Sequence, residues 1–190
     1  TSTLFHLAPE FFERLGPCVE LGRSFVREEH QKSFAPLLML WRGIGAFLAM
    51  NPRYRYLFGP VSISQSYSPA SRALIVRSLS RPWARSPLWP WVSPRTPFAV
   101  KRAAPPRVLR LCEALEDADE LDAAVADAEH DGKGLPVLLR QYLRMGARPL
   151  AFNVDPAFGN CIDGLCLFDV TDTASRSLHK YMGKDAAARY

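Results

Sequence analysis

The sequence lacks the features that most readily point to a metal site or a disulfide framework. Its four cysteines include no Cys-x-x-Cys pair, and its four histidines are scattered along the chain. A zinc site needs clustered ligands, so we expect no metal. Isolated cysteines of this kind are typical of small core residues in a reducing compartment. No internal repeat and no low-complexity tract is present either, so a repeat array is not expected.

Long apolar runs are also scarce. The longest, residues 34–50, is interrupted by Arg42, Gly43 and Gly45, and a membrane span needs about 20 apolar residues. It therefore predicts a buried helix. The first residues alternate between polar and apolar and do not resemble a signal peptide. We expect a cytoplasmic protein, with peripheral contact at the inner membrane as an option. The start at Thr1 rather than Met leads us to expect a piece of a longer protein.

The net charge is +5, and the charged residues are unevenly distributed along the chain. Residues 81–110 carry basic side chains and no acidic one, whereas residues 113–131 carry acidic side chains and no basic one. The basic segment also holds Trp83, Trp89 and Trp91. Such a segment could meet anionic lipid headgroups, an acidic carrier protein or nucleic acid, or it could face its own acidic neighbour. Of these partners, we do not expect nucleic acid.

The first half of the chain alternates between strand and helix patterns. A strand over residues 17–26 places Val19, Leu21 and Arg23 on one face. A helix over residues 34–50 comes next, with Pro36 in its first turn, where a missing N–H costs little. The next predicted elements are a strand over residues 54–63 and a helix over residues 69–79 that begins after Ser68 as its N-cap.

The second half begins with a proline-rich excursion, continues through two helices and two strands, and ends in a helix. Residues 81–106 hold seven prolines and predict an extended segment that docks on something. The acidic stretch predicts one helix over residues 113–129, with Leu115, Leu121 and Val125 as its apolar side. The further expected elements are a turn at 131–134, a helix over 135–145 closed by Gly146, strands over 150–154 and 162–170, and a helix over 173–181. This order favours an α/β (α+β) sandwich in one domain of 190 residues, with a basic insertion at about 81–110.

Several short words of the sequence occur in an order typical of one family. They are Glu20-Leu21-Gly22-Arg23-Ser24-Phe25-Val26, Leu40-Trp41-Arg42-Gly43-Ile44, Phe58-Gly59-Pro60-Val61-Ser62-Ile63-Ser64, Gly134-Leu135-Pro136-Val137-Leu138-Leu139-Arg140-Gln141-Tyr142, Phe152-Asn153-Val154-Asp155-Pro156, Asp163-Gly164-Leu165 and Tyr181-Met182-Gly183-Lys184. Together they resemble the GNAT-like acyltransferases known as hemolysin-like proteins and their relatives, the ornithine N-acyltransferases of ornithine-lipid synthesis.

The resemblance implies a GNAT-like fold, a central mixed sheet flanked by helices, whose first strands would precede Thr1. It also implies transfer of a fatty acyl chain from acyl carrier protein, or from acyl-CoA, to an amino group in aminolipid biosynthesis. Two alternatives stay open. One is O-acylation of a lysophospholipid, and the other is a non-catalytic module that docks on a membrane or carrier. Without its first strands the sheet would keep an open edge, so we expect residues 1–190 alone to be inactive.

The resemblance also assigns site residues to the first two predicted strands and the turn after the second. Glu20 would orient or deprotonate the amine, and Arg23 would hold a carboxylate or phosphate. The alternative for both is an ion pair that orders the sheet. Ser62 would return a proton to the leaving thiolate, and Ser64 and Tyr67 either share that role or cap the next helix. Backbone groups for the pantetheine arm and the thioester carbonyl would come from Ser24, Phe25 and Val26.

The loop before the long helix departs from the usual GNAT pattern. That pattern would bind the pyrophosphate of CoA from Gln31, Lys32 and Ser33 onward, but Phe34 and Pro36 occupy its two glycine positions. The departure favours acyl-phosphopantetheine on acyl carrier protein over acyl-CoA. Lys32, Arg27 and Arg42 could meet the acidic carrier. Asn153 and Asp155 are further candidates for contact with the acceptor, an amino acid or a lysolipid; their alternative is turn formation.

Overall fold

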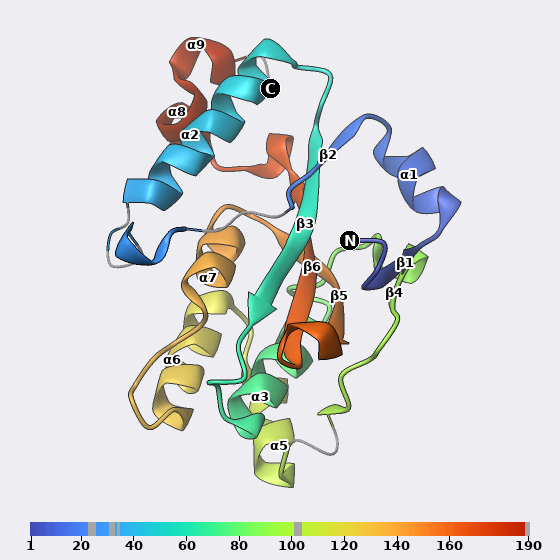
Figure 1. The fold of residues 1–190 in the computed structure, drawn as a ribbon, viewed down its shortest axis with the longest axis vertical. Helices are drawn as coiled ribbons and strands as arrows, with labels where there is room; N and C mark the ends of the chain where they lie inside the picture. The colour runs from blue at the N-terminus through green and yellow to red at the C-terminus, as the bar shows by residue number, and fades with distance from the viewer. Residues whose placement is uncertain (23–25, 31–32, 34, 101–103, 189–190) are drawn as a thin grey trace.

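The computed structural model describes residues 1–22, 26–30, 33, 35–100 and 104–188, and it shows a mixed α/β fold (Figure 1). Two sheets are flanked by helices, so the expected fold class is confirmed. The strands are β1 Phe5–Leu7, β2 Cys18–Glu20, β3 Tyr56–Ile63, β4 Val92–Pro94, β5 Arg148–Asp155 and β6 Cys161–Asp169. The α-helices are α1 Pro9–Leu15, α2 Ala35–Met50, α3 Pro69–Leu79, α5 Pro106–Ala114, α6 Ala118–Ala128, α7 Val137–Arg144, α8 Ser175–Met182 and α9 Lys184–Ala187.

The main sheet has the strand order β2-β3-β6-β5, with β2 parallel to β3 and the other neighbours antiparallel. This arrangement is compatible with a GNAT-like fold. The predicted strands 54–63, 150–154 and 162–170 correspond to β3, β5 and β6. The predicted strand 17–26 is shorter in the described residues, where β2 ends at Glu20. Val19 and Leu21 pack against the larger core, as their alternation predicts.

Alternate residues of β3 face two different cores. Leu57, Val61 and Ile63 belong to the larger core, which the sheet shares with α2, α3, α6, α7 and α8. Phe58 points to the other face, into a smaller core with Phe11 of α1. Figure 1 shows α2 with α8 at one end of the molecule and α3 with α5 at the other. None of the helices in the described ranges is long and apolar enough to span a membrane.

The proline-rich excursion docks on the chain's own sheet. Its β4 pairs with β1, and Ser86 N–H donates to the carbonyl of Pro149 on β5 at 2.8 Å. Further along, Val154 N–H donates to the carbonyl of Thr96 at 2.8 Å. Trp91 packs against the smaller core. The segment is extended only in part, because it also contains turns and the 3-10 helix Trp89–Trp91, and it covers the outer edge of β5, the edge that faces away from β6.

The single acidic helix predicted over residues 113–129 is wrong, because the chain breaks between α5 and α6. Asp117 caps α6 by accepting the Glu120 N–H at 2.8 Å. The Glu120 carboxylate in turn accepts the Glu116 N–H at 2.8 Å. This reciprocal cap satisfies free N–H groups at a helix start and fixes a new helix there. The predicted apolar side chains Leu115, Leu121 and Val125 are nonetheless all buried.

Other predicted helix boundaries are confirmed at α2 and α3. Pro36 lies in the first turn of α2, which ends at Met50 before Asn51-Pro52. The Ser68 hydroxyl oxygen accepts the Ser71 N–H at 3.1 Å and caps α3. Both boundaries are set by local side-chain chemistry, so the sequence alone is sufficient to place them.

Two glycines of α2 provide a matched test of how closely α2 and α8 pack. A methyl group on Gly45 would overlap the carbonyl oxygen of Tyr181, whereas one on Gly43 would meet nothing within 4 Å. Gly45→Ala is expected to lower the free energy of unfolding by about 2 kcal/mol, because backbone must move apart. Gly43→Ala should instead raise it by up to about 1 kcal/mol through helix propensity. Denaturant unfolding of both variants measures the difference; equal effects would contradict this packing.

Candidate functional site

In the part of the chain that the structure describes, the pairing of β2 with β3 covers three residues of each strand. The register joins Cys18–Glu20 to residues 56–58, and the Leu21 N–H makes a last bond to the carbonyl of Phe58 at 2.7 Å. Backbone groups alternate between the two edges of a strand, so the next β3 residue facing β2 is Pro60, which has no N–H to donate. Within the described residues, β3 beyond this point has no strand partner on its β2 side.

Glu20 lies at the last position of this short parallel pairing. Its side chain is 48% exposed, and its carboxylate accepts a hydrogen bond from the Thr1 hydroxyl at 2.5 Å. The predicted partners Arg23, Ser24 and Phe25 lie outside the described residues, as do Gln31 and Lys32. The choice between a catalytic Glu20 and an ion pair with Arg23 therefore stays a prediction.

Val26 and Ser33 are the described members of the predicted donor-binding segment. Val26 is half-buried and outside any helix or strand. The Ser33 hydroxyl accepts the Ala35 N–H at 3.2 Å, at the start of α2. Pro36 comes next and offers no N–H. Two positions of the first turn of α2 are thus not free to donate to a phosphate.

Ser62 is the predicted residue with the most distinctive surroundings. It lies near the end of β3 with an exposed side chain, and its hydroxyl donates to the carboxylate of Asp163 at 2.5 Å. Asp163 lies directly opposite on β6 and is only 4% exposed. Burial raises the pKa of Asp163 above its usual range, although the hydrogen bond from Ser62 acts against this. An exposed hydroxyl is therefore hydrogen-bonded to a buried carboxyl group.

Further polar side chains lie beside Asp163 at one end of this sheet face. The Cys161 thiol lies 3.9 Å from one carboxylate oxygen, and burial together with Asp163 raises the pKa of this thiol. Asn153 pairs with Asp163 from β5 and is buried. Its side-chain oxygen accepts the Thr96 N–H at 2.7 Å, so Asn153 holds the excursion in place. Asp155 accepts the Ala157 N–H at 2.9 Å, which is the turn-forming role that is the alternative for this residue.

Glu20 and Ser62 share a sheet face but are not in contact. Glu20 pairs with Phe58, and Ser62 comes four residues after Phe58 on the same face. At a rise of about 3.3 Å per residue, the separation along the strand is roughly 13 Å. The two side chains therefore do not contact each other.

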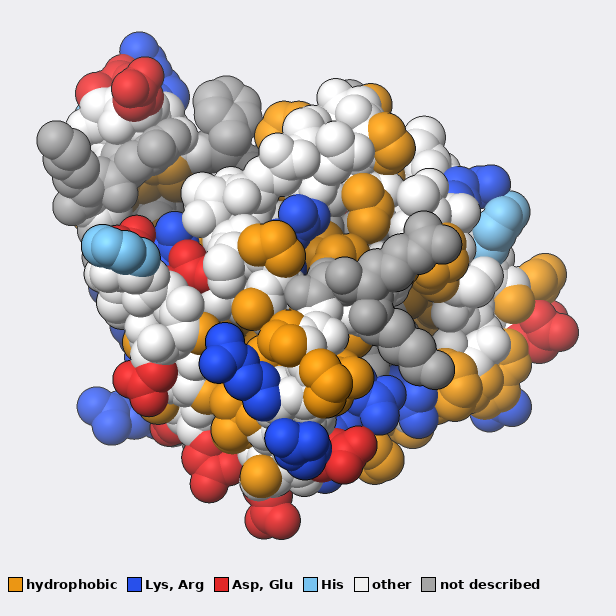
Figure 2. Space-filling view, turned by 90° about the horizontal axis from the view of Figure 1, so that it is seen from below, with side chains coloured by type: hydrophobic (Ala, Val, Ile, Leu, Met, Phe, Trp, Pro, Cys, Tyr) orange, Lys and Arg blue, Asp and Glu red, His pale blue; other side chains and the backbone are white. Residues whose placement is uncertain are grey.

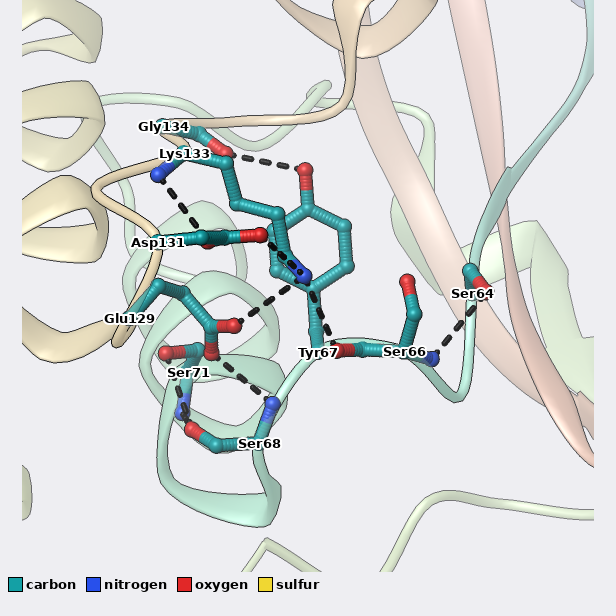
Figure 3. A network of polar contacts seen from close by, with 9 residues as sticks. All are labelled: Ser64, Ser66, Tyr67, Ser68, Ser71, Glu129, Asp131, Lys133 and Gly134. Atoms are coloured by element: carbon teal, nitrogen blue, oxygen red, sulfur yellow. Dashed lines mark hydrogen bonds and ion pairs between the residues drawn. The ribbon is translucent and has the colours of Figure 1, made fainter.

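The hydroxyls of Ser64 and Tyr67 are engaged in structural contacts (Figure 3). Ser64 accepts the Ser66 N–H at 3.1 Å, and Tyr67 donates to the carbonyl of Gly134 at 2.9 Å. The buried carboxylate of Glu129 accepts the Ser68 N–H at 2.8 Å and pairs with Lys133 at 3.4 Å. Burial works to raise the pKa of Glu129, but these hydrogen bonds outweigh it and lower the pKa. The network joins the start of α3 to the loop before α7.

The described hollows lie away from the predicted site residues. One of about 510 Å³ lies beside α3 and α5. Figure 2 shows hydrophobic side chains with Lys and Arg among them on the face seen from that end. Another of about 350 Å³ is lined by Arg14, Arg148 and Asp169, among others. Neither lining includes Glu20 or Ser62. Within the described ranges, no group of three His, Cys, Asp or Glu side chains is placed to hold a metal ion.

Asp163 is a functional candidate that the sequence-based site predictions miss, although a signal for it exists. It is the one charged residue in the run Cys161-Ile162-Asp163-Gly164-Leu165-Cys166-Leu167-Phe168. A carboxylate within a buried strand is costly unless it is hydrogen-bonded, so such a residue is a candidate for function. Its partner Ser62 could not be identified without the register of β3 against β6.

Comparison with known proteins found similarity to one kind of enzyme. The chain is 38% identical over 88 residues to a glycine N(α)-acyltransferase of Bacteroides thetaiotaomicron, an alignment that covers 43% of this chain and 26% of that protein. It is 34% identical over 88 residues to a glycine N(α)-acyltransferase of Phocaeicola vulgatus, covering 43% of this chain and 27% of that protein. The matched part is thus about a quarter of each relative. No family model and no solved structure matches the chain.

Proposed function

We propose that this chain is part of an N-acyltransferase that moves a fatty acyl group from acyl carrier protein to the amino group of an amino acid, giving an aminolipid precursor. The observation that carries the proposal is the similarity to two proteins named glycine N(α)-acyltransferase. The mixed sheet, which is compatible with a GNAT-like fold, agrees with it. Formation of an acyl-amide from a carrier-bound acyl group by the full-length protein tests it directly.

The edge of β3 on the β2 side supports a place for the acyl donor. A pantetheine arm is a chain of amides, so it can bond to a strand edge as another strand would. The edge of β3 beyond Pro60 is without a strand partner in the described residues. Glu20 lies at the end where pairing stops, and it would take the proton from the attacking amine directly or through water. Ser62 lies toward the other end.

The start of α2 favours carrier-bound phosphopantetheine over CoA as the donor. A CoA pyrophosphate is typically held by free N–H groups at a helix start. Here Ser33 accepts the Ala35 N–H, and Pro36 has none to give. A single phosphate needs fewer donors. Arg42 is exposed on α2, which carries no acidic residue, and it could attract the acidic carrier.

Arg42→Glu tests the carrier as donor. This variant is expected to raise KM for palmitoyl acyl carrier protein about tenfold, because reversal of a rim charge weakens electrostatic attraction. KM for the small donor S-palmitoyl pantetheine should stay within about twofold of wild type. Arg107→Glu is the matched control, because Arg107 is exposed on α5 at the opposite end of the molecule (Figure 1). Equal rises with both donors would argue against carrier docking at α2.

The two other functions are less well supported. O-acylation of a lysophospholipid has no counterpart in the names of the relatives, which specify an amino nitrogen. The alternative of a docking module built on the basic tryptophan segment, residues 81–110, is less well supported because this segment contacts the rest of the chain. Arg14 stacks on Trp91 at 4.0 Å and Arg85 stacks on Trp89 at 3.8 Å, while Trp91 also packs on the smaller core. Much of the segment thus contacts its own fold.

A further inference from the structure

A hollow of about 350 Å³ lies on the sheet face that carries Glu20, at the end of the sheet where β3 begins and β6 ends. The register places three of its lining residues on this face of neighbouring strands: Tyr56 on β3, Leu167 on β6 and Arg148 on β5. The helix α1 and the proline-rich excursion supply its walls. Its volume lies within the range of small-molecule sites, roughly 300–1000 Å³.

Charged side chains of both signs line the hollow, and in the part of the chain that the structure describes the two arginines form no ion pair with a carboxylate of this lining. Arg14 stacks its guanidinium on the ring of Trp91 at 4.0 Å, and Arg148 donates to the carbonyl of Trp83 at a long 3.4 Å. Asp172 is exposed, and its charge acts on the guanidinium of Arg55 without a hydrogen bond to it in the described residues. Most N–H groups of both arginines are therefore left to bind a ligand.

The remaining charged residue of the lining, Asp169, is already paired. Its carboxylate binds the guanidinium of Arg55 at 2.5 Å and accepts the Thr171 N–H at 3.0 Å. The charges that can meet a ligand are thus two guanidinium groups and the carboxylate of Asp172. A guanidinium binds a carboxylate or a phosphate through parallel N–H groups, and a carboxylate binds an ammonium group. Together they fit the two ends of a zwitterion.

We propose that this hollow binds a small zwitterion, with its anionic group at Arg14 and Arg148 and its ammonium group at Asp172. Leu88 and Leu167 line the same hollow and would contact the apolar part of the ligand. Two sources share this chemistry: a free amino acid, and the phosphoethanolamine headgroup of a lipid.

The hollow is separate from the predicted catalytic residues. Its lining includes neither Glu20 nor Ser62, and it does not include Phe58, the buried register partner of Glu20. A small ligand in the hollow would therefore not contact Glu20. Zwitterion binding at this place is independent of the proposed acyl transfer and can be measured without an acyl donor.

Isothermal titration calorimetry of the full-length protein, with L-leucine and with glycerophosphoethanolamine, measures binding and identifies the source. L-leucine has two analogues of similar size: isocaproate, which lacks the ammonium group, and L-leucinamide, which lacks the carboxylate. We expect wild-type protein to bind at least one of the two zwitterions. If L-leucine is the one bound, each analogue should bind at least about tenfold more weakly, because each loses one charged contact.

Two variants test the assigned residues. Arg148→Gln and Asp172→Asn are each expected to raise the Kd of the bound zwitterion about tenfold, because each removes one charge and keeps a similar size. Both side chains are exposed, so the unfolding midpoint should stay nearly unchanged. Arg110→Gln on α5 and Asp185→Asn on α9 are the matched controls, exposed outside this lining, and should leave the Kd unchanged.

Several results would overturn the site. They are no binding of either zwitterion, equal binding of the single-charge analogues of a bound L-leucine, and an unchanged Kd in both hollow variants. If Glu20→Gln raises the Kd for L-leucine while the hollow variants do not, the amino acid binds at the catalytic residues instead. Failure of the full-length protein to form an amide from an acyl donor would contradict the proposed function and leave these binding results as they are.

Discussion

Glu20→Gln is expected to lower kcat/KM for acyl-amide formation at neutral pH by about 100-fold or more. A carboxylate can take the proton of an attacking amine, whereas an amide of the same size cannot. The side chain is 48% exposed, so its replacement removes little packing and should leave the thermal unfolding midpoint nearly unchanged. The measurement is steady-state kinetics of the full-length protein with palmitoyl acyl carrier protein and glycine.

The control for this variant is Glu13→Gln, an exposed carboxylate on α1. It should leave the rate unchanged. A base role also predicts that the Glu20→Gln variant recovers activity at high pH, where solvent already supplies neutral amine. If the loss is the same at every pH and is accompanied by a lower unfolding midpoint, Glu20 instead acts in an ion pair that orders the sheet.

Gly59→Ala is expected to have the largest effect on stability, lowering the free energy of unfolding by about 3 kcal/mol. A methyl group there would overlap the carbonyl oxygen of Leu21. The contacting atoms of Leu21 belong to the backbone or lie close to it, so no side-chain rotation relieves the clash. The strand β2 would have to move from β3 at the point where their pairing ends. Denaturant unfolding measures the loss, and amide formation should fall as well because Glu20 is displaced.

Gly22→Ala is the matched control for this junction. Its added methyl group would lie 3.8 Å from the Glu20 carboxylate, which is an ordinary contact, and Gly22 is exposed. Its free energy of unfolding should stay within about 0.5 kcal/mol of wild type. Comparable losses for the two variants would contradict the close approach of Leu21 to Gly59.

Elements whose boundaries are set locally could be predicted from the sequence. The helix α3 begins after Ser68 because the serine hydroxyl caps it, and β3, β5 and β6 carry strongly apolar patterns. The pairing of β1 with β4 could not be predicted, since their partners Phe5 and Pro94 are far apart in the sequence. The break between α5 and α6 could not be predicted either. Asp117, which caps α6, lies within a run of carboxylates that has the pattern of one continuous helix.

The candidate site is predictable only in part, because its contacts join residues that are far apart in the sequence. Ser62 is a candidate from the sequence because it lies in a strand that the family resemblance places at the site, but its contact with Asp163 depends on the register between β3 and β6. Pro60 lies within β3 and has no N–H to give to a strand on the β2 side. The contact of Ser64 with the Ser66 N–H reflects ordinary turn chemistry, whereas the contact of Tyr67 with Gly134 depends on the tertiary fold.

Transfer of an acyl group to an amine would be shown by the identity of the acylated product. The full-length protein would be incubated with palmitoyl acyl carrier protein, a panel of amino acids that includes glycine and ornithine, and lysophospholipids. Mass spectrometry would then identify every acylated product. We expect an N-palmitoyl amino acid whose formation depends on Glu20. Acylated phospholipid as the sole product, formed equally by Glu20→Gln protein, would contradict it.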